Sequence, residues 1–177
     1  MIHPMERATE PPAAVVVMGV SGCGKTVIGR RLAAALGWTF RDGDDFHPPA
    51  NVTKMSGGVP LTDADREPWL ATLAALLTTA LVAGPPLVLG CSALRRAYRN
   101  RLGLPHARIR LVHLDGPVDM IRKRIEQRAG HYMPATLLDS QLAILERPGP
   151  DEAAIVIDVS EDPGQIVRQL IAALGLP

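Results

Sequence analysis

The chain has 177 residues, of which 47% are hydrophobic and 21% are charged, and its formal net charge is +1 at pH 7. This composition is close to the globular average, which excludes a disordered or fibrous protein, and the length suits one domain with a substantial core. A net charge this small gives no reason to expect a nucleic-acid partner or a membrane surface.

Residues 1–12 contain three prolines and show no periodicity, so we expect a flexible leader before a single domain at residues 13–177. Apolar runs then alternate with helical stretches, which predicts an α/β fold: a parallel sheet covered by helices on both faces, in three layers. Strands are predicted at residues 14–18, 38–42, 86–91, 109–114 and 153–158, and helices at residues 25–36, 63–83, 93–102, 117–128, 134–146 and 162–174.

The carboxyl ends of the predicted strands are where we expect functional residues, because ligands of open parallel sheets bind there. These ends follow positions 18, 42, 91, 114 and 158. Residues 68–94 carry no charge, but a glycine and two prolines at 84–86 interrupt the stretch. The segment is therefore expected to be a buried helix and a strand, and not a membrane span.

The segment after the first strand, residues 19–26 (GVSGCGKT), matches the phosphate-binding pattern G-x-x-x-x-G-K-[ST]. Its glycines allow turns that point backbone N–H groups at phosphate oxygens, and the following helix presents its positive dipole end. We expect Lys25 to reach the β- and γ-phosphates of ATP and Thr26 to offer its hydroxyl to Mg²⁺. The predicted nucleotide-binding residues are Gly19, Ser21, Gly22, Cys23, Gly24, Lys25 and Thr26.

A group of carboxylates follows the second strand at Asp42, Asp44 and Asp45. Phosphoryl transfer to an alcohol needs a residue that orients the hydroxyl and accepts its proton. We assign this role to Asp44 and expect Asp42 to hold Mg²⁺ through water, since an extended segment would put both side chains on one side. An acidic turn is the alternative explanation. Asp115, after the fourth strand, competes for the Mg²⁺ role, and Asp42 is preferred.

A basic segment contains Arg124 and Arg128, one helical turn apart, and leads into Gly130 and His131. It predicts a small helical lid at about residues 122–136, whose arginines stabilise charge on the transferred phosphate. A solvated basic helix is the alternative. His131 is treated as a lid or substrate contact and not as a metal ligand, because no second histidine or cysteine lies at ligand spacing.

The run from residue 42 to 70 (DGDDFHPPANVTKMSGGVPLTDADREPWL) resembles the gluconokinases of the shikimate and nucleoside monophosphate kinase group. The resemblance extends through residues 91–99 (CSALRRAYR), 128–132, 140–141 and 145–148, and so covers nearly the whole chain after the leader. Arg95, Asn100 and Arg147 depart from the usual family residues. The resemblance implies strand order 2-3-1-4-5, a homodimer, and transfer of the ATP γ-phosphate to the 6-hydroxyl of D-gluconate.

Gluconate carries one carboxylate and several hydroxyls, so its site needs a cation and short polar groups. For Arg66 the alternative is a local ion pair with Asp63 or Asp65 on the same helix. Residues 158–163 follow the last strand, where related kinases are expected to contact adenine through the backbone. The predicted substrate residues are Asp44, His47, Lys54, Arg66, Arg99, His131 and Gln141.

Three other interpretations compete with a gluconate kinase. A kinase of the same fold acting on shikimate or a nucleoside monophosphate is the nearest, but a shikimate kinase should show a glycine-rich end of the third strand, where this chain has Cys91-Ser-Ala-Leu. A non-catalytic nucleotide switch calls for a guanine-reading N-K-x-D motif, which the sequence lacks. A degenerate loop conflicts with the intact Lys25 and Thr26.

The cysteine content bears on the cellular compartment. Cys23 and Cys91 form neither a disulfide framework nor a zinc pattern, and no signal peptide precedes them. The sequence therefore predicts a reducing cytoplasm.

Overall fold

A five-stranded parallel sheet organises the structure, a computed structural model that describes residues 11–127 and 136–176. β1 lies at its centre and pairs in parallel with β3 and β4, with Ala14 opposite Leu87 and Ile109. The predicted α/β class and the strand order 2-3-1-4-5 are both confirmed. The strands are β1 (Ala14–Met18), β2 (Thr39–Asp42), β3 (Leu87–Gly90), β4 (Ile109–Asp115) and β5 (Ile155–Asp158).

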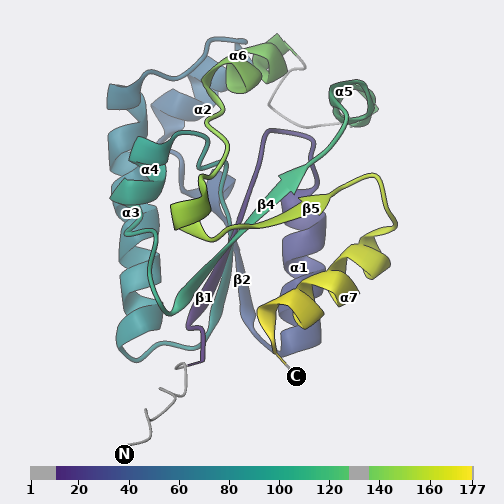
Figure 1. The fold of residues 1–177 in the computed structure, drawn as a ribbon. Coiled ribbons are helices and arrows are strands. Elements are labelled where there is room, and N and C mark those ends of the chain that lie inside the picture. Colours follow the sequence, from purple (N-terminus) through teal and green to yellow (C-terminus); the bar gives the residue numbers. More distant parts are fainter. Residues whose placement is uncertain (1–10, 128–135, 177) are drawn as a thin grey trace, which may run out of the picture.

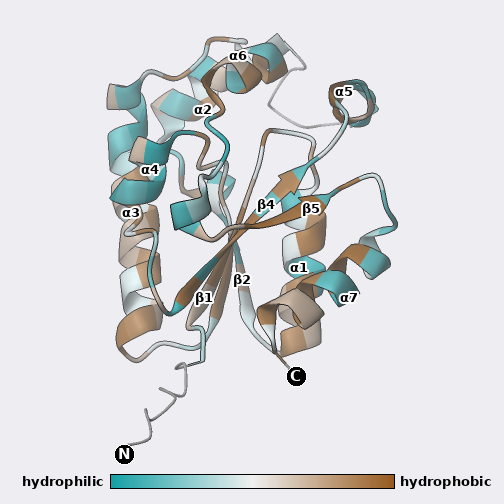
Figure 2. Ribbon diagram, viewed as in Figure 1, coloured by the Kyte–Doolittle hydropathy of each residue, from teal (hydrophilic) through white to brown (hydrophobic). Residues whose placement is uncertain are grey.

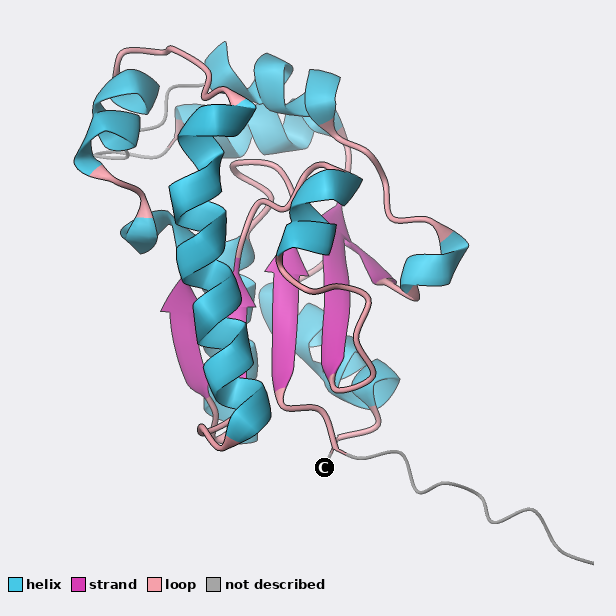
Figure 3. Cartoon of the chain, turned by 90° about the vertical axis from the view of Figure 1, so that its left-hand side faces the viewer, coloured by secondary structure: helices cyan, strands magenta, loops and turns pink. Residues whose placement is uncertain are grey.

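Helices cover both faces of the sheet and complete three layers (Figure 1). One face carries α1 (Lys25–Leu36) and α7 (Pro163–Leu174), and the other carries α3 (Asp63–Val82) and α4 (Arg96–Arg101). Figure 3 shows further helices gathered beyond the carboxyl ends of the strands. The remaining helices are α2 (Pro49–Ser56), α5 (Val118–Glu126), α6 (Thr136–Ile144) and the short 3₁₀ helices η1 (Gly43–Phe46) and η2 (Pro150–Glu152).

The central strand β1 shows how the sequence generates this layering. Successive side chains of a strand point to opposite faces. Val15 and Val17 accordingly join the apolar core under α1 and α7, while Val16 and Met18 join the core under α3. All five residues of β1 are buried, as expected for a strand covered on both faces. Figure 2 shows the strands mostly in hydrophobic colours, between helices with hydrophilic outer faces.

The segment after β2 differs from the prediction. The chain was expected to stay extended through Asp42 and Asp44, but it turns into η1 at Gly43. The Asp42 side chain causes this turn, because its Oδ1 accepts a hydrogen bond from the Asp44 backbone N–H at 3.1 Å. The alternation argument for these two carboxylates is therefore wrong.

One helix was missed by the sequence analysis, and another begins later than predicted. The α2 helix was not predicted, because its eight residues lie between Pro48 and Gly57 in a segment that looks like a loop. The helix expected from residue 93 begins at Arg96. Residues 91–95 instead form a loop in which Ala93 has a positive φ of 44°.

Helix α3 starts with a capping box. The Thr62 hydroxyl accepts a hydrogen bond from the Asp65 N–H at 3.1 Å, and the Asp65 carboxylate accepts one from the Thr62 N–H at 2.9 Å. This start places Asp63, Arg66 and Trp69 at successive turns near the carboxyl ends of the strands. Within residues 11–127 and 136–176, no helix is long and apolar enough to cross a membrane.

Candidate active site

The loop between β1 and α1 has the backbone of a phosphate-binding loop. Gly19 has a φ of 148°, and a Cβ there would lie 2.7 Å from the Leu114 carbonyl oxygen. Gly22 has a φ of 82°, and a Cβ there would lie 2.4 Å from the Ile125 Cγ1. Larger residues would be strained in conformation and would collide with their neighbours. Gly24, also with a positive φ, then caps the N-terminus of α1.

Hydrogen bonds connect this loop to the carboxylates after β2. The Lys25 Nζ donates to the carbonyl oxygens of Gly19 at 3.0 Å and Val20 at 3.1 Å. The Thr26 hydroxyl donates to Asp42 Oδ2 at 2.6 Å, and Asp42 Oδ1 holds the Asp44 N–H. Asp42 thus joins the first turn of α1 to the segment that carries Asp44.

The donor set at Thr26 and Asp42 suits Mg²⁺, which prefers oxygen ligands. Among the described residues, no group of three or more His, Cys, Asp or Glu side chains could enclose a metal ion. A hydroxyl and a carboxylate alone leave most of an octahedral shell open. They fit an ion that arrives with a nucleotide and keeps phosphate and water ligands.

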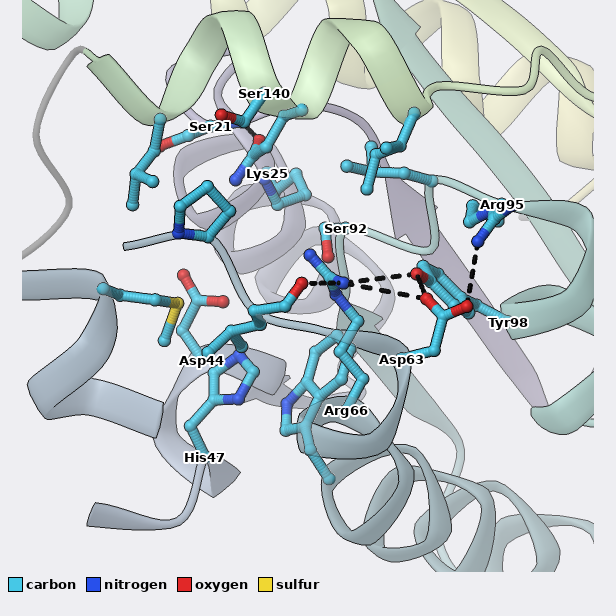
Figure 4. A pocket seen from close by; sticks show the side chains of 18 residues that line it. Ser21, Lys25, Asp44, His47, Asp63, Arg66, Ser92, Arg95, Tyr98 and Ser140 are labelled. Atoms are coloured by element: carbon cyan, nitrogen blue, oxygen red, sulfur yellow. Dashed lines mark hydrogen bonds and ion pairs between the residues drawn. The ribbon is translucent and has the colours of Figure 1, made fainter. Parts of the chain in front are cut away.

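A cavity of about 210 Å³ opens beside Lys25 at the carboxyl ends of the strands. We call it the α3 cavity, and Figure 4 shows the side chains of Lys25, Asp44 and Arg66 converging on it. Its lining joins the phosphate loop, α3, the loop after β3, α4 and α6. The lining residues are Ser21, Lys25, Asp44, His47, Met55, Pro60, Leu61, Asp63, Arg66, Trp69, Ser92, Leu94, Arg95, Tyr98, Leu137, Ser140, Gln141 and Ile144.

One wall of the α3 cavity is a network of charged and phenolic groups. Arg66 donates from Nη1 to the Leu61 carbonyl and to the Tyr98 hydroxyl at 3.3 Å. The Tyr98 hydroxyl donates to Asp63, and Arg95 donates to Asp63 at 2.9 Å. The hydrogen bond from Tyr98, reinforced by the charge of Arg95, holds the pKa of Asp63 below its usual value. The network keeps both guanidinium groups at the cavity.

The alternative expected for Arg66, a local ion pair on the same helix, is present only as a long contact with Asp63 and does not account for the rest of its surroundings. Its closest approach to Asp63 is 4.0 Å, and Asp65 pairs instead with Lys54 at 2.7 Å. The Arg66 side chain is only 14% exposed and lies 5.4 Å from the centroid of the Tyr98 ring. It therefore belongs to the cavity wall.

His47 follows η1, three residues after Asp44, and its ring stacks on Trp69. The ring centroids are 4.4 Å apart with an interplanar angle of 12°. Burial, with a smaller contribution from the charge of Arg66, lowers the pKa of His47 to about 4. His47 is thus a neutral hydrogen-bonding group at the cavity near pH 7. Its Nδ1 is buried without a hydrogen-bond partner among the described residues.

This lowered pKa predicts a loss of stability in mild acid. Between pH 6.5 and 4 the unfolded chain binds a proton at His47 that the folded chain does not, so the free energy of unfolding falls as the pH falls. Allowing for partial solvent screening, we expect about 1 kcal/mol from His47 between pH 7 and pH 5. Urea unfolding of the wild type and His47→Gln at both pH values should show a smaller loss for the variant.

The buried His113 serves as an internal reference for that comparison. Burial also lowers its pKa, so it contributes acid destabilisation of the same sign in both proteins. The difference between the two proteins therefore isolates His47. Equal pH dependence in the wild type and His47→Gln would contradict the prediction.

A second cavity, of about 360 Å³, lies on the other side of the phosphate loop against α7. We call it the α7 cavity. Arg124 lines it and donates to the Val159 carbonyl at 2.8 Å. Apolar walls with a few polar groups suit a flat heterocycle. The lining residues are Gly22, Cys23, Gly24, Val27, Ile28, Arg124, Gln127, Val159, Glu161, Pro163 and Ile166.

Helix α6 contacts the phosphate loop directly through Gln141. Its Oε1 accepts a hydrogen bond from the Ser21 backbone N–H at 2.6 Å. Gln141 and Ser140 both line the α3 cavity. The predicted substrate residue Gln141 therefore lies where the loop and the α3 cavity meet.

Two other predicted substrate residues lie outside the cavity lining. Lys54 forms its ion pair with Asp65 at the start of α3. Arg99 is 0% exposed, and its Nε and Nη2 donate to the Glu152 carboxylate at 2.5 and 2.9 Å. Its Nη1 donates to the carbonyl oxygens of Ala93, Leu94 and Glu146. The structure thus corrects the expectation for Arg99, because a fully buried guanidinium whose three nitrogens all donate to groups of the protein is not accessible to a substrate.

The buried ion pair of Arg99 is expected to be important for stability. Arg99→Leu leaves the Glu152 carboxylate buried without its cation, so the free energy of unfolding should fall by about 3–5 kcal/mol. Arg101→Leu is the matched control, since Arg101 pairs with Glu67 at the surface and should cost less than about 1 kcal/mol. Urea unfolding measures both. A loss for Arg99→Leu no greater than that of the control would contradict the assignment.

Two predicted residues, Arg128 and His131, and most of the predicted lid at residues 122–136 lie outside the described residues. Asp115, the competing Mg²⁺ residue, forms an ion pair with Arg147. That pairing lowers the pKa of Asp115 despite its partial burial. Asp42, hydrogen-bonded to Thr26, is the carboxylate next to the phosphate loop.

Sequence reasoning did not select several residues of the α3 cavity, above all Asp63, Arg95 and Tyr98. A local signal was present. Asp63 and Arg66 are three residues apart at the start of α3, and Arg95 and Tyr98 are three apart at the start of α4. Pairs at this spacing share a helix face. Only the packing of α3 against α4 shows that the two pairs face each other.

The chain is similar in sequence to a known protein family and to several characterised proteins, and similar in structure to a solved one. A family model described as AAA domain matches residues 15–148. A gluconokinase of Gluconobacter oxydans is 50% identical over 160 residues, which cover 90% of this chain and 90% of that protein. The thermosensitive gluconokinase of Escherichia coli is 45% identical over 157 residues, covering 87% of this chain and 83% of that protein. The crystal structure of a gluconokinase from Sinorhizobium meliloti 1021 has a TM-score of 0.82 at 42% identity, covering 93% and 92% of the two chains.

Proposed function

The chain belongs to the gluconokinase family, and from this premise we propose that it transfers the γ-phosphate of ATP to the 6-hydroxyl of D-gluconate, giving 6-phospho-D-gluconate and ADP. It is accordingly a P-loop kinase that acts on an alcohol group. A shikimate kinase shares the fold, but the high identity to gluconokinases does not favour shikimate as the acceptor.

One observation carries the proposal: the phosphate loop separates two cavities. Ser21 and Lys25 line the α3 cavity, whereas Gly22, Cys23 and Gly24 line the α7 cavity. A nucleotide whose base occupies the α7 cavity has its phosphates on the loop. An acceptor in the α3 cavity then meets the terminal phosphate at Lys25, as in-line transfer requires.

The chemistry of the α3 cavity fits a polyhydroxy acid. Arg66 and Arg95 offer cations for one carboxylate, held in place by Asp63 and Tyr98. Neutral donors and acceptors at His47, Ser92, Ser140 and Gln141 suit hydroxyl groups. This combination supports a sugar acid over a neutral sugar, because a neutral sugar offers no carboxylate for the two guanidinium groups to bind.

In the mechanism we assign, Asp44 orients the 6-hydroxyl and accepts its proton as the new bond to phosphorus forms and the bond to the β-phosphate bridging oxygen breaks. Lys25 stabilises the charge that develops on the β- and γ-phosphate oxygens. Thr26 and Asp42 would hold the Mg²⁺ that arrives with ATP, and the ion would supply further charge neutralisation there. Asp42 also holds the backbone of Asp44 in place.

The nucleotide side of the proposal involves the α7 cavity. We assign the adenine to this cavity, between the phosphate loop and the residues after β5, and Arg124 to a nucleotide contact there. Arg128 and His131 keep their proposed roles as charge-stabilising and substrate-contacting residues.

Two further properties belong to the proposal. The buried thiols of Cys23 and Cys91 support a reducing, cytoplasmic location. Burial raises the pKa of Cys91 to about 12, which keeps it an unreactive thiol. A homodimer follows from the family resemblance, and sedimentation equilibrium of the purified chain would test it.

A coupled assay of ADP release tests the function. The wild type is assayed with ATP and Mg²⁺ against D-gluconate, shikimate, AMP and glucose. We expect turnover with gluconate alone. Turnover with another acceptor at a comparable or higher rate would overturn the choice of substrate, and its absence with all four would overturn the proposed function.

A further inference from the structure

We propose that Trp69 is a positioning residue for phosphoryl transfer, holding η1 so that the Asp44 carboxylate is directed at the acceptor hydroxyl. The inference rests on the proposed function and on the role of Asp44 as proton acceptor. It assigns to α3 a second task, apart from presenting Asp63 and Arg66 to the cavity.

Trp69 holds η1 at both ends. Its Nε1–H donates to the Gly43 carbonyl oxygen at 2.7 Å, a buried hydrogen bond at the first residue of η1. Its ring stacks on His47, the residue that follows the last turn of η1. Asp44 lies between these two contacts, and Figure 4 shows the Asp44 and His47 side chains close together at the cavity.

The opposite side of η1 is equally constrained. A Cβ on Gly43 would lie 2.5 Å from the Gly90 carbonyl oxygen at the end of β3. The segment is therefore pressed against the sheet on one side and held by Trp69 on the other. Trp69 belongs to α3, is only 1% exposed and packs in the core between α3 and the sheet. Its position, and with it that of η1, is therefore set by a rigid helix.

Two residues hold the backbone around Asp44 by hydrogen bonds from different sides. Asp42 holds the Asp44 backbone N–H from the side of the phosphate loop. Trp69 holds the preceding carbonyl from the side of α3. Removal of the indole N–H would leave that carbonyl buried without its donor, and the segment would shift to recover a partner. Displacement of a catalytic group by about 1 Å costs up to about 100-fold in rate.

Trp69→Phe is the test, since it keeps a buried aromatic ring in α3 and deletes the N–H donor together with part of the indole, a loss of buried volume that the control below accounts for. We expect kcat with gluconate to fall about tenfold, with the KM for ATP changed less than twofold. The variant is then combined with Asp44→Asn in a double-mutant cycle measured by sensitive single-turnover assays. If Trp69 acts through Asp44, Trp69→Phe causes no further loss in the Asp44→Asn background.

A control in the same helix separates positioning from stability. Leu77 is buried two turns further along α3 and lines neither cavity. Leu77→Ala, or the milder Leu77→Val if the former does not fold, should lower the thermal midpoint at least as much as Trp69→Phe while kcat stays within twofold. An equal loss of kcat in the Leu77 variant would overturn the positioning role.

The remaining outcomes distinguish the inference from the proposed function. If the wild type turns over gluconate, two results would overturn the positioning role alone. One is a normal kcat in Trp69→Phe, and the other is a loss in Trp69→Phe that multiplies with the loss in Asp44→Asn. A wild type without gluconate turnover overturns the proposed function and, with it, the positioning role that rests on it.

Discussion

Replacing Asp44 with asparagine is expected to lower kcat for gluconate phosphorylation by about 10²- to 10⁴-fold, the range typical of a lost general base. Asparagine keeps the size of the side chain and its place beside Lys25 at the cavity. It removes the acceptor for the hydroxyl proton, so the alcohol must attack without losing that proton to the protein. The coupled assay of ADP release measures the effect at saturating gluconate and ATP.

The neighbouring carboxylate offers a matched control. Asp45 lies on the same 3₁₀ helix, is exposed, and does not line the α3 cavity. Asp45→Asn makes the same chemical change one residue away, and its kcat should stay within about twofold because exposed charges interact weakly. A near-normal kcat for Asp44→Asn, or equal losses in both variants, would show that Asp44 is not the proton acceptor.

Replacing Lys25 with methionine is expected to lower kcat by about 10²- to 10³-fold, which corresponds to about 2.7–4 kcal/mol of transition-state stabilisation. Methionine has a similar length but no charge, so the developing negative charge on the transferred phosphate loses its nearest cation. The Nζ hydrogen bonds to Gly19 and Val20 are lost as well, but these are partly solvated contacts within the loop. The fold should therefore persist.

Two measurements check the assignment of Lys25. The thermal midpoint of Lys25→Met should lie within a few degrees of the wild type, since a change of about 1 kcal/mol shifts it by about 2–4 °C in a chain of this size. Lys123→Met is the control, because Lys123 is an exposed cation of α5 outside both cavities. Full activity of Lys25→Met would contradict a phosphate-binding role for the loop.

Much of the fold was predictable because its signals are local. The strand at residues 14–18 and the helix at residues 25–36 were predicted with the bounds that the structure shows. A buried apolar run and the glycine spacing of a phosphate loop depend on residues that are neighbours in sequence. The α2 helix was missed because eight residues between a proline and a glycine carry too short a pattern.

The site was predictable only in part, and the carboxylates show why. Both Asp42 and Asp44 were selected correctly as residues close to the loop, but for a wrong reason. Their relation comes from a hydrogen bond of Asp42 to the Asp44 backbone, which bends the chain into η1. A side chain that competes for backbone donors can override the alternation expected of a strand.

By itself the sequence determined the α/β class, the phosphate loop and the carboxylates that lie near this loop, because each follows from short-range pattern and backbone chemistry. Only the tertiary structure decided that Arg66, and not Arg99, lines the α3 cavity. Both Arg66 and Arg99 were predicted from the sequence to contact the substrate. Arg99 instead pairs in the interior with Glu152, more than fifty residues away in the sequence, while a hydrogen bond to Tyr98 keeps Arg66 at the α3 cavity. The position of a charged side chain depends on the partner that folding brings to it, and burial of a charge requires such a partner.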